Sequence, residues 1–527
     1  MTNIISLRSA GLCCTALCLA AGCATANDTA IGNATALSTD GHELIETLDA
    51  GIHETAQEWR SAARIAVANR AKGPRTNSQA KNVILFVGDG MGPTTVAAAR
   101  IFAGQQAGRD GESNSLSFEE FPHVAFSKTY TTDFQVPDSA GTATAMLTGA
   151  KTRSRVLGVS ENVDRGDCAT ALASPIPTLA EYAEIRGLST GIVTTTSVTH
   201  ATPASTYAHT PHRNWENDTE VPQGAKDAGC IDIATQLINF PYGDGIDIVL
   251  GGGRSHFLPK TIADVETGEA GGRSDGVDLL SQWSEKSSNH YVATNQTEFR
   301  AAPDNAKLLG VFEPEHMKFE LDRLNDAGGE PSLSQMTERA ISSLSQNDKG
   351  FFLLVEGGRI DHAHHGGNAK RALEDTVAFA DAVTIARDMT SERDTLIIVT
   401  ADHGHTLTFQ GYPSRGNDIL DIVKIHDDDG ELEPAPARGD KRTYTTLAYA
   451  NGPGAQFWKS AKDGRPAITS EEATHDDHQQ QAIIDTGSET HGGQDVGVYA
   501  SGPGADLVSG VMEQNVIFQI MMDAYGW

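Results

Sequence analysis

The sequence has little positive charge, and this shortage argues against one class of partner. Its 527 residues hold 40 lysines and arginines against 70 aspartates and glutamates, which gives a formal net charge of −30 at pH 7. So acidic a chain repels phosphate backbones, and we therefore expect no nucleic-acid-binding role. The same charge repels anionic substrates at long range, unless local cations reverse the field.

Cysteine is scarce as well, which excludes a densely cross-linked fold. Of the six cysteines, four lie at positions 13, 14, 18 and 23, and only Cys168 and Cys230 remain in the body of the chain. In an exported protein an isolated pair of cysteines predicts a disulfide, and two free buried thiols are the alternative.

Apolar runs long enough to span a bilayer are absent. Arg8 is followed by an apolar stretch at residues 10–21, which is too short for a permanent membrane helix and is typical of a signal peptide. Residues 19–23 read L-A-A-G-C and resemble a bacterial lipobox with Cys23 as the acylated first mature residue; ordinary cleavage near Ala26 is the alternative. We expect a signal peptide at residues 1–23 and export to the periplasm or cell envelope. A lipid anchor at Cys23 would be the only contact with a membrane.

Beyond the leader, residues 24–75 are expected to form a tether and an N-terminal helix, the helix at residues 41–71. From residue 76 to residue 527, short apolar runs alternate with helical patterns. The strand candidates are residues 83–87, 191–195, 246–250, 351–355, 396–399 and 496–500, and helices are expected at residues 178–186 and 369–389. This alternation predicts an α/β fold, a three-layer sandwich with a large, mostly parallel central sheet flanked by helices. Residues 424–485 break the rhythm and are predicted to be a surface insertion.

Acids and histidines gather next to these strands. In open α/β sheets, ligands bind beyond the carboxyl ends of the strands. The residues concerned are Asp89, His200, Thr202, Glu356, Asp361, His365, Asp402, His403, His405, Glu489 and His491. Zinc accepts both carboxylate and imidazole ligands, and burying so many unpaired carboxylates would be costly without a cation. The pattern therefore predicts a metal centre.

Ser139 is the candidate nucleophile. It stands in D-S-A-G-T-A-T-A, where small residues and good helix formers follow it. This places Ser139 at a helix N-terminus, where free N–H groups favour an anion. A helix cap is the alternative reading. Because no G-x-S-x-G motif surrounds this serine, a metal rather than a histidine triad would have to activate it.

Six motifs give the chain a resemblance to the alkaline phosphatase family, in order, from about residue 80 to the C-terminus. They are G-D-G-M-G, D-S-A-G-T-A-T-A, H-A-T-P-A-S-T-Y-A-H, E-G-G-R-I-D-H-A-H-H, A-D-H-G-H and E-T-H-G-G. The chain is more similar to the animal-type enzymes than to the enteric bacterial type, as marked by His200, His362, residues 209–215 and residues 411–413. Residues 76–527 would then be an alkaline phosphatase domain.

The resemblance implies two zinc ions and one magnesium ion. The implied ligands are Asp361, His365 and His491 for one zinc; Asp89, Asp402, His403 and the Ser139 oxygen for the second zinc; and Asp89, Thr202 and Glu356, with waters, for magnesium. His200 stands where the enteric enzymes have an aspartate and would lie near the magnesium without binding it directly, so the identity of that metal stays open. His362 would tune phosphate affinity through water, and His405 would orient a ligand or line the pocket.

The implied reaction is hydrolysis of phosphate monoesters to an alcohol and inorganic phosphate through a phosphoserine at Ser139. Arg213 would clamp the phosphate with its planar fork. Relatives also suggest a homodimer and a disulfide between Cys168 and Cys230. A calcium site is a further suggestion: Glu313 and Glu330 fit part of its pattern, but Ala228 replaces an expected acid next to Asp227.

Other functions on the same scaffold would need different residues or belong to related enzymes. A sulfatase would need a cysteine or serine in a C/S-x-P-x-R context, and S-A-G-T-A at residues 139–143 lacks the proline and the arginine. A phosphodiesterase commonly has a threonine nucleophile and no counterpart of Arg213, and a mutase is a third relative. A non-catalytic metal-binding or phosphate-binding lipoprotein is the alternative from another class.

Overall fold

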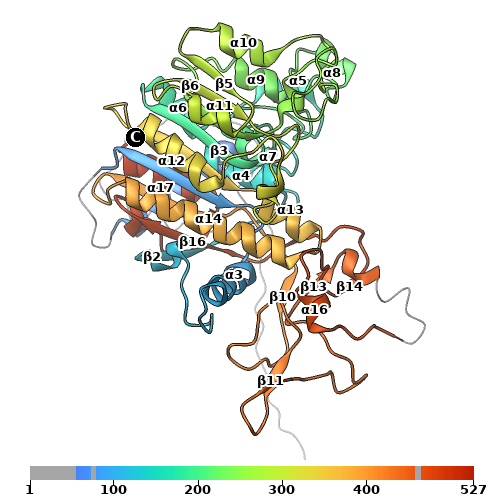
Figure 1. The fold of residues 1–527 in the computed structure, drawn as a ribbon. Coiled ribbons are helices and arrows are strands. Elements are labelled where there is room, and N and C mark those ends of the chain that lie inside the picture. The colour runs from blue at the N-terminus through green and yellow to red at the C-terminus, as the bar shows by residue number, and fades with distance from the viewer. Residues whose placement is uncertain (1–54, 73–78, 457–463) are drawn as a thin grey trace, which may run out of the picture. The chain divides into compact units, whose positions relative to one another are not determined.

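Ten strands in the order β17-β2-β16-β8-β1-β7-β3-β4-β6-β5 form the central sheet of the computed structural model (Figure 1). The structure describes residues 55–72, 79–456 and 464–527. Strand β16 runs antiparallel to both its neighbours, and the other adjacent strands run parallel. The predicted α/β fold with a large, mostly parallel sheet is confirmed.

Each predicted strand is present, with bounds that differ by a few residues. The strands of the sheet are β1 (Asn82–Gly88), β2 (His123–Lys128), β3 (Ser189–Ser197), β4 (Ile248–Gly252), β5 (His290–Ala293), β6 (Lys307–Val311), β7 (Phe351–Gly357), β8 (Thr395–Ala401), β16 (Val496–Ser501) and β17 (Gly510–Glu513). Strands β2, β5, β6 and β17 were not predicted from the sequence. These strands lie toward the two edges of the sheet. Strand β2 is exposed on one face, and β5 and β17 are four residues long, whereas β6 is as long and as buried as the predicted β4.

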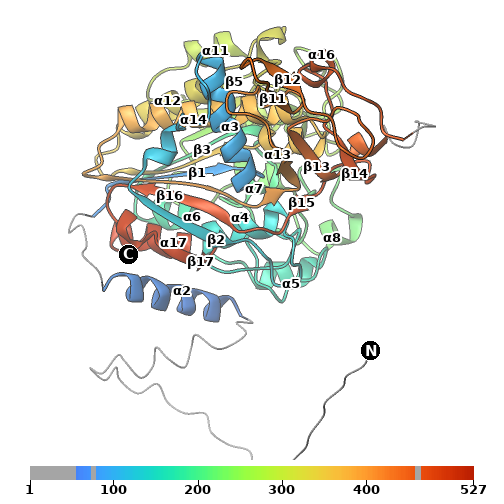
Figure 2. The same ribbon diagram turned by 90° about the horizontal axis from the view of Figure 1, so that it is seen from below.

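Helices cover both faces of the sheet (Figure 2). One face carries α3 (Pro93–Gln106), α12 (Leu333–Leu344) and α14 (Ala369–Met389); the other carries α2 (Ala56–Arg70), α4 (Ser139–Thr148), α6 (Leu179–Ile185) and α17 (Val516–Tyr525). Alternate residues of β1 enter the two cores: Val83, Leu85 and Val87 face the second set of helices, whereas Ile84 and Phe86 face the first. This double burial explains why the central strands are continuously apolar.

The N-terminal helix is described from Ala56 to Arg70, and its expected beginning at residue 41 lies outside the described residues. Trp59, Ala63 and Val67 are its buried residues, and they recur at helical spacing. The leader, the tether and Cys23 also lie outside the described residues. No helix in the described part of the chain has the length and apolarity that a membrane crossing requires.

The segment at residues 424–485 adds small sheets beside the central one. The hairpin of β11 (Lys424–His426) and β12 (Leu432–Pro434) stands apart from β10 (Leu407–Phe409), β13 (Leu447–Asn451) and β14 (Ala482–Ile484), which form a three-stranded sheet. Figure 1 shows these strands together with α16 (Ser470–Ala473) at one end of the central sheet.

The predicted disulfide is present. Cys168, the first residue of α5 (Cys168–Ala173), is bonded to Cys230, 62 positions further along the chain. The bridge joins two loop-rich segments on either side of Arg213, and it packs with Trp215 and Val221 in a small apolar cluster. It therefore ties together the chain around the candidate phosphate clamp.

Candidate metal centre and active site

The candidate site lies at the carboxyl ends of adjacent central strands. Asp89 directly follows β1, Glu356 is near the end of β7, and Asp402 directly follows β8. The register pairs Gly88 of β1 with both Gly357 and Ala401, so these strand ends lie level with one another. All three carboxylates are fully buried. Parallel pairing thus places acids from distant parts of the sequence at one edge of the sheet.

Two short helices bring further groups to this edge. Helix α13 (Arg359–His365) follows β7 and carries Asp361 and His365 four positions apart, so both side chains lie on one face. Helix α4 begins at Ser139, and its N-cap Asp138 accepts a hydrogen bond from the Gly141 N–H over 3.3 Å. The nucleophile candidate and the cap are therefore neighbouring residues, which reconciles the two readings of this motif.

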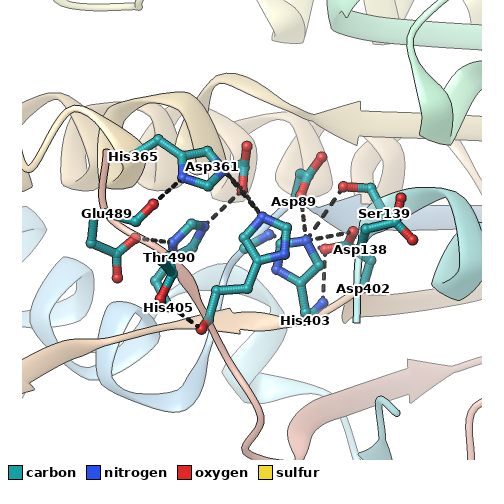
Figure 3. A network of polar contacts seen from close by, with 12 residues as sticks. Asp89, Asp138, Ser139, Asp361, His365, Asp402, His403, His405, Glu489 and Thr490 are labelled. Carbon is teal, nitrogen blue, oxygen red and sulfur yellow. Dashed lines mark hydrogen bonds and ion pairs between the residues drawn. The ribbon is translucent and has the colours of Figure 1, made fainter. Parts of the chain in front are cut away.

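Three unprotonated ligand atoms converge in the first cluster (Figure 3). The Nδ1 atom of His365 lies 2.5 Å from the Glu489 carbonyl oxygen, and that of His491 lies 2.8 Å from the Pro137 carbonyl oxygen. A carbonyl only accepts, so each Nδ1 carries the proton and each Nε2 a lone pair. The two Nε2 atoms are 3.1 Å apart, and each lies within 3.4 Å of Asp361 Oδ1. Ligand atoms of these types so close together suit a metal ion between them.

His405 belongs to the same cluster but makes different contacts from His365 and His491. Its Nε2 lies 2.8 Å from Asp361 Oδ1 and its Nδ1 lies 2.5 Å from Glu489 Oε2. Although burial lowers it, these hydrogen bonds raise the pKa of His405 to about 9. An imidazolium has no lone pair to offer a metal. This geometry suits orientation of Asp361 by His405 rather than metal binding.

A second cluster surrounds the nucleophile candidate. His403 Nε2 lies 3.3 Å from Ser139 Oγ, 3.3 Å from Asp402 Oδ2 and 3.5 Å from Asp89 Oδ1. Neither carboxylate oxygen of Asp89 accepts a hydrogen bond. Burial, and then the nearby Asp402 and Asp361, raise the pKa of Asp89 well above its usual value. A buried carboxylate without a donor is costly, and a metal ion would remove that cost.

A third cluster contains hard oxygen atoms. The unpartnered oxygens here are those of Asp89, Glu356 Oε1 and Thr202 Oγ1, while Glu356 Oε2 accepts from Thr194 and Thr196. Burial raises the pKa of Glu356 to about 7. Carboxylate and hydroxyl oxygens suit magnesium, which also keeps bound waters. The donor set therefore fits that ion.

His200 lies beside this third cluster with its Nδ1 atom buried and unpartnered. Its Nε2 lies 2.8 Å from Arg213 Nη2. Since an arginine only donates, Nε2 accepts and Nδ1 carries the proton. A protonated nitrogen donates a hydrogen bond rather than binding a metal. This geometry therefore suits a contact between His200 and a metal ion through a bound water.

Arg213 is held at the mouth of the site. Its Nη1 lies 3.1 Å from Asp138 Oδ2, and its other terminal nitrogen bonds His200. Its side chain is 18% exposed, so one side of the guanidinium remains open to a ligand. The structure thus brings the predicted metal ligands, nucleophile and phosphate clamp together at the carboxyl edge of the sheet, with Arg213 paired to the N-cap residue of α4.

Three residues make contacts in the candidate site that the sequence did not predict. Glu489 holds both His365 and His405, and its position in the E-T-H-G-G motif was the available signal. His316 packs on His362 with ring centroids 4.3 Å apart and on His200 at 5.5 Å, and no motif marked it. Arg359 Nη1 lies 2.8 Å from His362 Nδ1 and so fixes that ring.

The acids around the suggested calcium site group differently from the expectation. Glu313 clusters with Glu266 and Asp326, whereas Asp227 accepts a hydrogen bond from Gln223 in α8 (Gln223–Asp227). Glu330 is buried, and burial together with Glu313 raises its pKa to about 9. The candidate cation cluster is therefore Glu266, Glu313 and Asp326, which shares only Glu313 with the expected residues and includes neither Glu330 nor Asp227.

Comparison with known proteins agrees with the geometry. A family model described as alkaline phosphatase matches residues 80–526. The tissue-nonspecific alkaline phosphatase of Rattus norvegicus is 44% identical over 474 residues, covering 88% of this chain and 87% of that protein. The human isozyme is 43% identical over 473 residues, with coverage of 88% and 87%.

A solved structure also matches. The Thermus thermophilus alkaline phosphatase superposes with a TM-score of 0.61 at 25% identity, covering 88% of this chain and 94% of that one. The family model spans most of the chain, and the animal relatives exceed the identity at which family membership is secure. The chain therefore belongs to the alkaline phosphatase family and is a phosphomonoester hydrolase.

Proposed function

We propose that this chain hydrolyses phosphate monoesters through a phosphoserine formed at Ser139. The observation that carries the proposal is the convergence of His365, His491 and Asp361 on one point, beside a serine at a helix N-terminus. Ser139 is 2% exposed and lies against His403, so bulk water has little access to its side chain.

Two zinc ions and one magnesium ion are the cofactors that we propose. The ligands would be Asp361, His365 and His491 for one zinc; Asp89, Asp402, His403 and Ser139 for the other; and Asp89, Thr202 and Glu356 for magnesium. Bound zinc lowers the pKa of an oxygen that it holds and neutralises charge that builds up on phosphate oxygens.

The chain's own groups position the reacting atoms. Ser139 Oγ attacks phosphorus in line with the leaving oxygen, and water later attacks the phosphoserine from the vacated side. Arg213 presents two N–H groups to the phosphate, held in orientation by Asp138 and His200. The free N–H groups at the start of α4 favour the same negative charge. Catalysis is then largely electrostatic and positional.

A calcium ion would fit the acids at Glu266, Glu313 and Asp326. Burial raises the pKa of Glu313 to about 7, which a bound cation would reverse. Calcium prefers several oxygen ligands of this kind.

We also propose export, a lipid anchor at Cys23 and a homodimer. The disulfide between Cys168 and Cys230 supports an oxidising compartment. An exposed apolar patch supports self-association: Val124 and Phe126 on β2 are 49% and 45% exposed, and Val511 on β17 pairs with Phe126. Mass measurement of the purified mature protein would test the anchor and the oligomeric state.

Replacing Ser139 by alanine tests the nucleophile. The variant should lose turnover of a monoester by at least about a thousandfold and form no phosphoenzyme, because the attacking oxygen is gone, while zinc stays bound to the remaining ligands. Ser127→Ala is the matched control, since that serine is equally buried but lies on β2. Rates on a monoester, a diester and a sulfate ester, together with metal content, should be measured. Full activity in Ser139→Ala would rule out the assignment.

A further inference from the structure

One strained residue lies beside the candidate active site. Of the non-glycine residues that the structure describes, only Arg155 and Lys441 have a positive φ, 70° and 61° respectively. This left-handed region is unfavourable for residues with a side chain, because Cβ crowds the backbone. Strain of this kind concentrates at functional sites and persists only where neighbours hold it.

Two backbone hydrogen bonds hold Arg155 between the cap of α4 and the phosphate clamp. Its N–H donates to Asp138 Oδ1 over 3.0 Å, and its carbonyl accepts from the Arg213 N–H over 2.9 Å. Asp138 immediately precedes Ser139. The side chain of Arg155 is exposed. The strained backbone therefore lies between the cap of Ser139 and Arg213, and it carries a long, exposed cationic side chain.

A second exposed arginine comes to the same place from another loop. Arg165 Nε donates to His212 Nε2 over 2.9 Å, and His212 directly precedes Arg213. Burial, and then Arg165, Arg155 and Arg213 in that order, lower the pKa of His212. Arg165 therefore contacts this half-buried ring directly, and the positive charges of Arg155 and Arg213 also act on it.

This group of residues has more donors than acceptors. The Asn214 N–H faces His212 Nδ1 at 3.1 Å while Arg165 faces Nε2, yet a neutral imidazole accepts at one nitrogen only. One of the two donors therefore has no good acceptor on the ring. An anion beside Arg165 would supply the missing acceptor.

Nearby acids do not supply it. Asp164 pairs with Arg153 over 3.0 Å, and Asp138 pairs with Arg213 over 3.1 Å. No ion pair joins Arg155 or Arg165 to an acid anywhere in the described part of the chain. In a chain of net charge −30, two exposed arginine side chains without an ion-pair partner among the described residues are available to an anion, even though Asp138 accepts a hydrogen bond from the Arg155 backbone.

We propose that Arg155 and Arg165 form a second anion subsite next to Arg213, which binds the second phosphate of a phosphoanhydride substrate such as a nucleoside diphosphate. The inference rests on the proposed function of Ser139 and Arg213. The terminal phosphate would bind to Arg213, and the adjacent phosphate of the leaving group would lie against Arg155 and Arg165.

The reaction balances without a further reagent. The bond between the terminal phosphorus and the bridging oxygen breaks, and that oxygen leaves with the nucleoside monophosphate. The phosphoryl group passes to Ser139 Oγ and then to water, which yields inorganic phosphate. Arg155 and Arg165 would stabilise the negative charge of the departing group, which a monoester with an uncharged leaving group does not carry.

Rates on ADP and AMP test the subsite, because the two substrates share a nucleoside and differ by the second phosphate. In Arg155→Gly, which accepts the positive φ and deletes the cation, the ratio of kcat/KM for ADP to that for AMP should fall about fivefold. Arg165→Gln should lower the ratio in the same direction. Arg155→Lys should restore part of it, and added salt should reduce the difference between wild type and Arg155→Gly.

Lys441→Gly is the matched control, because Lys441 is the other exposed cation at positive φ. It should leave both rates unchanged. An unchanged ratio in Arg155→Gly, or an equal fall for both substrates, would overturn the subsite. Failure of the wild-type protein to hydrolyse either nucleotide would instead count against the proposed function itself.

Discussion

Glu489 shows how one buried residue organises several candidate ligands. Its carbonyl oxygen lies 2.5 Å from His365 Nδ1, and its carboxylate accepts from His405 Nδ1 and from the Thr406 N–H. These contacts fix the tautomer of His365 and the charge of His405, which in turn orients Asp361. Groups that hold metal ligands in this way usually matter nearly as much as the ligands.

We predict that Glu489→Gln weakens zinc binding by about tenfold to a hundredfold. The amide is similar in shape but removes the negative charge that keeps His405 protonated, so Asp361 loses a charged partner. Titration against a chromophoric zinc chelator would measure the change. Glu119→Gln, which removes a partner of Arg100 instead, should bind zinc as the wild type does. Unaltered zinc affinity in Glu489→Gln would exclude the role given to this acid.

At the scale of elements, the turn after β1 is as constrained as the ligands. Gly90 has a φ of 70°, and its N–H donates to Asp402 Oδ1 over 3.0 Å. A Cβ at this position would lie 2.4 Å from His405 Nε2 and 3.3 Å from Asp361 Cα. The turn therefore leaves room only for glycine, because the imidazole that orients Asp361 occupies the adjacent space.

We predict that Gly90→Ala lowers monoesterase activity at least tenfold and reduces bound zinc, because His405 and Asp361 must move apart from the new methyl group. Gly108→Ala is the control: its φ is 73°, but nothing lies within 4 Å of a Cβ there. Both substitutions place a Cβ at a positive φ, but only Gly90→Ala also brings that Cβ into contact with His405 and Asp361. Equal effects of the two substitutions on activity and metal content would show that strain alone is responsible.

The elements also show where sequence patterns suffice. Strands β1, β7 and β8 are buried on both faces, and their continuous apolar runs predicted them. Helix α14 was predicted with the bounds that it has, because it begins after an Asn368 cap and ends at the residue before Thr390. Strand β2 and the edge strand β17 were not predicted, since β2 exposes Val124 and Phe126 and β17 is four residues long.

At the scale of the whole molecule, burial of acids away from the site makes stability depend on pH. Glu184 in α6 is 2% exposed, and burial raises its pKa to about 8, against the effect of a hydrogen bond from Thr190. An unfolded glutamate titrates near pH 4.3. The folded chain therefore binds an extra proton between these values, and stability falls as pH rises through that window.

We predict that Glu184→Gln loses less stability than the wild type between pH 5 and pH 9. At pH 9 the variant should be more stable by on the order of 3 kcal/mol, because glutamine needs no proton to stay neutral. Thermal melts with the metals present throughout would measure this. The exposed Glu285→Gln should follow the wild-type curve. Parallel curves for Glu184→Gln and the wild type would contradict the assignment.

The sequence by itself determined the α/β fold, the strand-end position of the acids and histidines, the disulfide and the family. These follow from local patterns: the spacing of apolar residues, the types of residue and the order of motifs along the chain. Tertiary structure decided how the site residues are used. The contacts of His405 with Asp361 and Glu489, those of Glu489 with two histidines, and the position of Arg155 beside Arg213 all join residues far apart in sequence. Lone pairs, tautomers and a strained φ are set by those contacts, and no local pattern encodes them.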